Sequence, residues 1–367
     1  MGRYNRDVGG YRGRRTITDI LKFIAAVLAV LVVVVLGGIF YLQRYVVYTD
    51  EGAKLELPPF LQFLRWEREE PEPAESNTPP DLSDVSFTED PSGSVSEPVS
   101  EPEEPAGFAL ELPVSDVVSG AAAEKLAQAG AQALILEVKD QEGRLAWHSG
   151  RAEADRAQVN GSQANSDALA QWNQGEVYTI ARVCCFRDNS IPYYYNKLAL
   201  RVSGGNWRDE LGLRWLSPAQ EDAQGYIAAL CGELAGLGFN EIVLEQFAFP
   251  TAGKLDHITR GENYDAAQFT PRLESLLTQI QQAVEPYGTK ISLRVGRDTL
   301  TGAETSSGVT GALLEGYAFR VWMDEDGLLP PLPDLLEPAG ITGGTERLVS
   351  IAGARTEGSQ LFQAVVP

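Results

Sequence analysis

Two glutamates near the ends of apolar, strand-like segments could form a catalytic carboxylate pair. Glu137 lies in the segment 133–139, and Glu245 lies in the segment 241–247. Glycoside hydrolysis uses two carboxyl groups that flank the scissile bond, since one donates a proton and the other acts as base or nucleophile. Asp140 directly follows the first segment and competes with Glu137 for the partner role. Its alternative role is to form a tight turn with the residues that follow it.

Charged side chains on four predicted strands alternate with aliphatic ones. Successive residues of a strand point to opposite faces, so each strand separates its aliphatic residues from its ionisable ones. The aliphatic face should pack against helices, and the ionisable face should then point toward the centre of the fold. Charges buried there must pair to offset the cost of desolvation. Both a structural ion network and a polar pocket fit this pattern. The side chains are Glu137, Lys139, Arg182, Glu245 and Arg294.

Further binding residues are predicted in the loops that follow the third strand. Trp207 and Trp215 lie in the segment 204–218 and suit stacking on a sugar ring, although they could instead cover the barrel as core. Asp188 lies just beyond the strand and either contacts substrate or turns the chain. The predicted catalytic residues are Glu245 with Glu137 or Asp140, and the predicted substrate-binding residues are Lys139, Arg182, Asp188, Trp207, Trp215 and Arg294.

The composition excludes several other classes of protein. The chain has 51 acidic and 30 basic residues and a formal charge of −21, which argues against nucleic-acid binding because phosphates require a basic face. Three cysteines cannot provide a disulfide framework, and two histidines cannot form a His-rich metal site. No motif requires a metal or a cofactor, and no G-x-G-x-x-G opens a helix after the first strand.

Eight apolar segments alternate with helical ones and predict the elements that position these residues. Such alternation indicates a parallel sheet, and eight strands in about 260 residues fit a (β/α)8 TIM-like barrel. An open, doubly wound sheet is the alternative. Helical patterns become poor after residue 300, so the barrel can be degenerate in its C-terminal third. The predicted strands are 108–113, 133–139, 177–185, 241–247, 290–296, 316–323, 347–353 and 361–366, and the predicted helices are 120–130, 164–174, 218–237 and 268–286.

The N-terminal part of the chain predicts a membrane anchor. Residues 1–22 form a basic tail with a net charge of +4, and residues 23–42 are apolar and uncharged. Twenty helical residues span about 30 Å, the thickness of a bilayer core. The positive-inside rule then places the N-terminus in the cytoplasm and the rest of the chain outside the cell. A cleaved secretory signal is the alternative interpretation.

The anchor is connected to a single large domain through two further segments. Residues 43–66 form a juxtamembrane segment, and residues 67–106 form an acidic linker with eight prolines and a net charge of −12. A segment of this composition cannot bury enough apolar surface to fold, so we expect a disordered, extended spacer. Residues 107–367 form the predicted barrel domain.

A combination of short motifs over residues 107–300 resembles a family of bacterial, often membrane-anchored α/β-barrel domains classed as candidate glycoside hydrolases. The resemblance implies a sugar-active barrel with a polysaccharide or cell-wall glycan as its partner. The residues that carry it are Leu136-Glu137-Val138-Lys139-Asp140 with Gly143, Ile180-Ala181-Arg182 with Phe186 and Asp188, Trp207-Arg208-Asp209 with Gly212, Trp215 and Pro218, and Gly238-Phe239-Asn240-Glu241-Ile242 running to Phe249-Pro250.

Several positions depart from the pattern of that family. Glu137 and Ser217 replace aspartates, and the family's Asp-Tyr-Val-Arg-Phe-Pro is here Glu245-Gln246-Phe247-Ala248-Phe249-Pro250. A carboxylate moved by about 1 Å can lose on the order of 100-fold in rate. Three hypotheses therefore remain open. The first is a membrane-anchored extracellular hydrolase of cell-envelope or environmental polysaccharide, and the second is a catalytically inactive barrel that binds a glycan or a partner. The third is a structural envelope protein whose linker and barrel act as a spacer.

Overall fold

The computed structural model describes the barrel domain almost completely. Residues 107–261, 264–324, 339–359 and 361–367 are described, together with Leu336 and the backbone of residues 46–49 and 52–55. The predicted basic tail, membrane anchor and acidic linker, and most of the juxtamembrane segment, lie outside the described residues. Within the described part of the chain, no helix combines the length and apolar character of a membrane span.

The described residues of the segment 43–66 form a short hairpin. Strands β1 (Val46–Thr49) and β2 (Gly52–Leu55) pair in antiparallel register, with Tyr48 opposite Ala53. The hairpin belongs to a different compact unit from the barrel.

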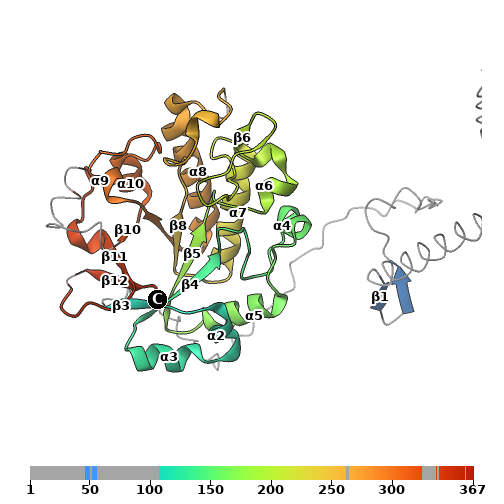
Figure 1. Cartoon of the computed structure of the whole chain (residues 1–367). Coiled ribbons are helices and arrows are strands. Elements are labelled where there is room, and N and C mark those ends of the chain that lie inside the picture. Colours follow the sequence, from blue (N-terminus) through green and yellow to red (C-terminus); the bar gives the residue numbers. More distant parts are fainter. Residues whose placement is uncertain are drawn as a thin grey trace, which may run out of the picture. The chain divides into compact units, whose positions relative to one another are not determined.

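Eight parallel strands close into a barrel, as predicted, and the open-sheet alternative is wrong. Each strand pairs with its two neighbours in the order β10-β11-β12-β3-β4-β5-β8-β9, and β9 pairs with β10. Figure 1 shows β12 beside β3, where the first and last barrel strands meet. The strands are β3 (Phe108–Glu111), β4 (Ala133–Lys139), β5 (Tyr178–Cys184), β8 (Glu241–Glu245), β9 (Lys290–Arg294), β10 (Val321–Asp324), β11 (Leu348–Ala352) and β12 (Phe362–Val365).

Helices follow the first five barrel strands, and the four predicted helices correspond to α3, α5, α7 and α8. The segment 316–323 was predicted to be one strand, but its first residues belong to α10. The side chain of Thr310 caps this helix by accepting a hydrogen bond from the amide of Leu313. The helices are α2 (Val114–Ser119), α3 (Ala122–Ala129), α4 (Ala152–Ala157), α5 (Gln163–Trp172), α6 (Ile191–Tyr194), α7 (Glu221–Gly236), α8 (Phe269–Val284), α9 (Arg297–Leu300) and α10 (Gly311–Tyr317).

The C-terminal third departs from a regular barrel, as the sequence predicted. Residues 353–359, between β11 and β12, contain no helix, and only a 3-10 turn (Gly344–Arg347) immediately precedes β11 in the described residues. Other short elements lie in the loops: the hairpin β6 (Arg201–Val202) and β7 (Gly205–Asn206), and 3-10 turns at Asn196–Leu198, Leu255–His257, Ala266–Gln268 and Glu285–Tyr287.

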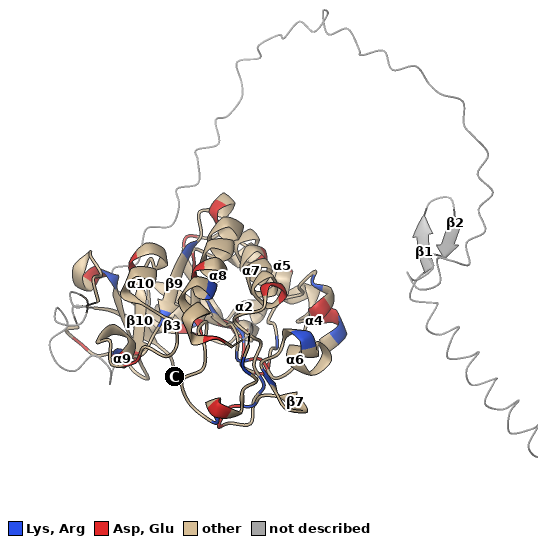
Figure 2. Cartoon of the chain, turned by 90° about the horizontal axis from the view of Figure 1, so that it is seen from above, with Lys and Arg blue, Asp and Glu red and all other residues tan. Residues whose placement is uncertain are grey.

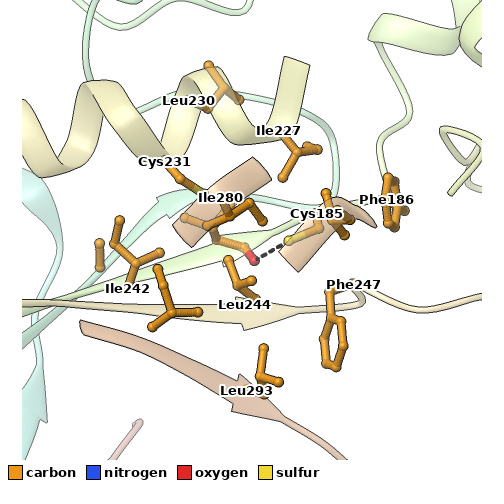
Figure 3. Packing of buried hydrophobic residues seen from close by; sticks show 14 of the residues in the cluster. Cys185, Phe186, Ile227, Leu230, Cys231, Ile242, Leu244, Phe247, Ile280 and Leu293 are labelled. Atoms are coloured by element: carbon orange, nitrogen blue, oxygen red, sulfur yellow. Dashed lines mark hydrogen bonds between the residues drawn. The ribbon is translucent and has the colours of Figure 1, made fainter. Parts of the chain in front are cut away.

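The aliphatic faces of the strands pack outward against the helices. Ile242 and Leu244 of β8 are fully buried and contact the layer that α7 and α8 form outside the barrel. Ile227 and Ile280 contribute to this layer from the two helices, which lie side by side (Figures 1 and 3). Burying a side chain of this size stabilises the fold by roughly 1.5–3 kcal/mol. The ionisable residues of β8, Glu241 and Glu245, therefore point inward.

A buried polar cluster fills the barrel near the N-terminal strand ends. Glu241 is fully buried and accepts hydrogen bonds from Trp322 Nε1 at 3.1 Å and Tyr178 Oη at 3.3 Å. Arg320 Nη1 lies 3.8 Å from its Oε2. Burial raises the pKa of Glu241, although Arg320 and the hydrogen bonds oppose the shift. The sequence pattern did not predict a role for these residues, which fill the N-terminal end of the barrel, called the barrel floor below.

Candidate functional site

A cavity of about 920 Å3 opens at the C-terminal ends of the barrel strands. Active sites of TIM barrels lie at this face, because the loops that follow the strands surround it. The volume is within the range of small-molecule pockets. Four of the five ionisable side chains predicted to meet in the barrel line this cavity, namely Glu137, Arg182, Glu245 and Arg294.

Five alternating charges form a ladder across five strands at the base of the cavity. Arg182 of β5 donates to Glu111 of β3 and, through Nε and Nη2, to both carboxylate oxygens of Glu245 at 2.9 and 3.1 Å. Arg294 of β9 donates to Glu245 Oε1 at 2.8 Å and to Asp324 of β10 at 2.7 Å. All five residues have the inward parity of their strands. We call this set the charge ladder.

Glu245 at the centre of the charge ladder is held in its ionised form. Burial alone would raise the pKa of this carboxyl group, but the hydrogen bonds and charge of Arg182, followed by those of Arg294, outweigh it and lower the pKa below 4.5. The same bonds raise the pKa of Arg182 against the effect of its own burial. Glu245 is therefore a carboxylate at any ordinary pH.

Glu137 has the opposite electrostatic environment. It lies on the inward face of β4 at the level of Arg182 and is exposed to the cavity. Desolvation raises the pKa of its carboxyl group, and the charges of Glu111, Asp140 and Glu245 add to the increase, whereas Arg182 opposes it. Glu137 thus retains its proton to higher pH than an ordinary glutamate does.

The prediction that Lys139 points into the barrel is wrong, because β4 contains a bulge. The register with β5 shifts between Glu137 and Lys139, so that Lys139 pairs with the outward-facing Val183. Its side chain is fully buried away from the cavity and lies 2.9 Å from Asp188 Oδ2. It also donates to the carbonyl oxygen of Cys184 at 2.7 Å. A bulge reverses the parity of every later residue in its strand.

Asp188, a predicted substrate-binding residue, is also fully buried and outside the cavity lining. Its Oδ1 accepts hydrogen bonds from the backbone amides of Ser190 at 3.0 Å and Ile191 at 2.8 Å. A Cβ atom on Gly143, which has a φ of 85°, would lie 2.4 Å from the same oxygen. The motif residues Lys139, Gly143 and Asp188 therefore form one packed unit that holds two loops together behind the cavity.

Asp140 lines the cavity but occupies a turn, which was its alternative role. Its Oδ1 accepts hydrogen bonds from the amides of Glu142 and Arg144, each at 2.9 Å. The amide of Gly143 donates to the carbonyl oxygen of Asp140 at 3.1 Å, which closes the turn. One carboxylate oxygen is thus committed to backbone, and Glu137 has the freer carboxyl group of the two.

Trp207 and Trp215 contribute to the wall of the cavity but are 2% and 3% exposed. Their rings pack edge to face with centroids 6.0 Å apart. Trp207 Nε1 donates to the carbonyl oxygen of Lys254, and Trp215 Nε1 donates to Asp209, both at 3.0 Å. Stacking on a sugar needs an open ring face, so this arrangement favours the core alternative for both residues.

Gln246 is a cavity residue that sequence analysis did not select. It follows Glu245 directly and has a φ of 49°, a left-handed conformation that residues other than glycine seldom adopt. Its carbonyl oxygen accepts a hydrogen bond from the amide of Phe186 at 3.0 Å, which anchors the turn at the end of β8. Such outliers concentrate at functional sites.

Two other members of the charge ladder were missed. Glu111 could have been found, because it alternates with Ala109 in the first predicted strand. Asp324 could not, since the predicted strand ended before it. Cys184 also lines the cavity, but burial raises the pKa of its thiol to about 12, so it is no nucleophile. Within the described residues, no three carboxylate, imidazole or thiol groups gather closely enough to hold a metal ion.

The closed barrel and its polar mouth define a class of α/β-barrel domains that includes many sugar-cleaving enzymes. Residues 120–307 match the model of a family described as "putative glycosyl hydrolase domain". The match covers half of the chain, and the protein belongs to this family. The family resemblance predicted from the motifs is confirmed.

Comparisons with solved structures return chains that share little sequence with this protein. A hypothetical protein from Ruminiclostridium thermocellum is 21% identical, with a TM-score of 0.42 over 50% of this chain and 96% of its own. A chitobiase from Flavobacterium johnsoniae is 12% identical, with a TM-score of 0.42 over 68% and 38%. The glycoside hydrolase domain of a PelA variant from Pseudomonas aeruginosa is 12% identical, with a TM-score of 0.36 over 66% and 83%. The chain thus spans less than half the length of the chitobiase. No curated protein matches the chain.

Proposed function

We propose that this protein is a glycoside hydrolase that uses Glu137 as general acid and Glu245 as its ionised partner. One observation carries the proposal: two carboxyl groups in one cavity have pKa values shifted in opposite directions. Glycosidases divide the roles of acid and of base or nucleophile between such groups. Membership of a family of glycosyl hydrolase-like domains supports the choice of a glycan as substrate.

The position of the two residues suits this division of roles. Strands β4 and β8 flank β5, so about 10 Å of sheet separates their backbones, and both side chains point inward from it. Glu137, whose pKa is raised, would donate its proton to the leaving oxygen. Glu245 remains an anion and would stabilise positive charge on the sugar or activate water. Arg182, between them, keeps Glu245 ionised and lowers the pKa of Glu137 less than burial raises it.

A second candidate is a barrel that binds glycan without cleaving it. The observation that favours it is that both oxygens of Glu245 are occupied by guanidinium groups, at 2.8 to 3.1 Å. A carboxylate so engaged is a weak nucleophile. The charge ladder would then form a rigid polar surface at the base of the cavity, to which sugar hydroxyls hydrogen-bond.

The two candidates are separated by measuring cleavage and binding of the same oligosaccharides. The full-length protein, in neutral detergent, is incubated with a panel of oligosaccharides, and products are detected by chromatography. Glu137→Gln and Glu245→Gln should each reduce cleavage by roughly 100-fold or more while leaving binding largely intact. Glu274→Gln is the matched control, since Glu274 is exposed on α8 and does not line the cavity. Binding without any cleavage by the wild-type protein would favour the second candidate, and neither binding nor cleavage would refute both.

The substrate is proposed to be extracellular polysaccharide, of the cell envelope or the environment. Residues 23–42 would anchor the chain in the cell membrane as a single-pass helix, with the N-terminus in the cytoplasm and the barrel outside. The support for this topology is the uncharged apolar segment that follows the basic tail. The acidic linker would then set the distance between the barrel and the bilayer.

The cysteines of the chain make the topology simple to test. All three, Cys184, Cys185 and Cys231, are buried in the barrel and should not react with a thiol reagent in intact cells. A membrane-impermeant maleimide should label an Ser92→Cys variant from outside and should not label Asn5→Cys until the cells are opened. Labelling of Asn5→Cys in intact cells would contradict the topology, and release of the Ser92→Cys protein into the medium would indicate a cleaved signal.

A further inference from the structure

Each guanidinium group that lines the cavity lies close to a carboxylate. Four arginines line it, and no lysine does in the described part of the chain. Arg182 and Arg294 belong to the charge ladder. Arg187 lies 2.8 Å from Asp209, and Arg144 lies within 3.7 Å of its turn partner, Asp140. Each cation of the described cavity therefore has a carboxylate partner, and only the exposed Arg144 is held as loosely as 3.7 Å.

The carboxylates of the cavity, in contrast, are in excess. Nine line it, and five of these have no cationic partner among the described residues. Two of the five accept hydrogen bonds from neutral groups: Glu142 from Asn189, and Glu304 from the serines that follow it. The side chains of Glu137, Glu210 and Asp298 make neither hydrogen bonds nor ion pairs within residues 107–261 and 264–324, and all three are exposed.

The excess carboxylates line the cavity from different elements of the chain. Glu210 follows β7, and Asp298 lies on α9 beyond β9, so the two residues come from segments that are distant in the sequence. They do not converge into a metal site, since the described residues contain no such cluster. A cleft lined by charges of one sign concentrates ligands of the opposite sign. The walls of this cavity thus attract cations, while its floor is an internally paired network.

We infer that the cavity selects glycans with free amino groups, that is, oligosaccharides of positively charged amino sugars. This inference rests on the proposed function, because it specifies the ligand of the same cavity. Ammonium groups along the sugar chain would pair with Glu210 and Asp298 at the walls. Neutral glycans could not form these ion pairs, and anionic glycans would be repelled.

The test compares three hexasaccharides of the same length and different charge. Binding of the glucosamine, N-acetylglucosamine and glucose hexamers to the full-length protein is measured by calorimetry at mildly acidic pH, where amino sugars are protonated. The glucosamine hexamer should bind about tenfold more tightly than either neutral hexamer, since each of the two exposed charge pairs contributes up to roughly fivefold in affinity. The preference should shrink at high salt, which screens exposed charges.

Two charge-matched variants show whether the cavity is the source of the preference. Glu210→Gln combined with Asp298→Asn should reduce the preference about fivefold or more. Glu274→Gln combined with Asp167→Asn removes the same charge from α8 and α5 (labelled in Figure 2), whose residues do not line the cavity, and should leave the preference unchanged. If the neutral hexamers bind as tightly as the glucosamine hexamer, the inference is overturned, although glycan binding itself is supported. An equal effect of both double variants also overturns it. Failure of all three hexamers to bind counts against the proposed function itself.

Discussion

Replacing either member of the buried pair of Lys139 and Asp188 should destabilise the barrel strongly. Both side chains are fully buried, and their charged atoms are 2.9 Å apart. Removing one partner of such a pair leaves a buried charge and typically costs about 3–5 kcal/mol. Lys139→Met should lower the free energy of unfolding by about 3 kcal/mol, at the small end of this range, because Asp188 retains two backbone amide donors. Asp188→Asn should cost about the same, since the lysine still donates to a carbonyl oxygen.

The assay is unfolding in urea, followed by tryptophan fluorescence, with the two single variants and the double variant. In a protein of this size, about 3 kcal/mol corresponds to a decrease in Tm of roughly 6–12 °C. The double variant should cost about 2 kcal/mol less than the sum of the single variants, because it leaves no unpaired charge. If the free energy of unfolding of Lys139→Met lies within about 0.5 kcal/mol of the wild-type value and the variant nevertheless loses glycan binding, Lys139 contacts ligand and the structural reasoning is refuted.

Three further outcomes follow from the geometry. Gly143→Ala should lower the free energy of unfolding by roughly 3 kcal/mol, because its left-handed φ and the approach of Asp188 both oppose a Cβ atom. Trp322→Phe should cost about 1–3 kcal/mol, since it removes a hydrogen bond from the buried Glu241. Between the ordinary pKa of 4.5 and the lowered pKa of Glu245 in the folded state, stability should fall as the pH falls, because the unfolded chain takes up this proton first.

Each of these outcomes has a matched control. Gly212→Ala has a similar φ of 78° but no atom within 4 Å of the added Cβ, so it should cost only about 1–2 kcal/mol. Trp172→Phe removes an indole N–H that has no hydrogen-bond partner in the described structure, so no bond is lost. Glu245→Gln should make the acid destabilisation shallower. Equal losses for each variant and its control, or an unchanged acid limb in Glu245→Gln, would show that the named contacts are not the cause.

The architecture followed from periodicity, because each barrel strand is a short apolar segment between helical ones. The inward position of Glu137, Arg182, Glu245 and Arg294 followed from their parity within those strands. Parity failed at Lys139, because a bulge inserts Val138 and turns the lysine outward. No local signal in the sequence marks that bulge.

Other features depended on contacts between distant parts of the chain. The two tryptophans of the loop are polar enough at one edge to suit a sugar, and only their burial by the loop 204–218 and Lys254 shows them to be core. The floor formed by Glu241 and Trp322 joins strands that are 81 residues apart in sequence. Glu111 was missed because its strand was short, not because the pattern was absent.

The most direct test of the account is the pH dependence of glycan hydrolysis by the wild-type protein and by Glu137→Gln. We predict a bell-shaped profile whose acid limb lies below 4.5, the ordinary pKa of a glutamate, and whose alkaline limb lies above it, from the lowered pKa of Glu245 and the raised pKa of Glu137. Glu137→Gln should lose the alkaline limb together with roughly 100-fold or more of the rate. An alkaline limb that persists in Glu137→Gln at undiminished rate would contradict the assignment of Glu137 as the acid.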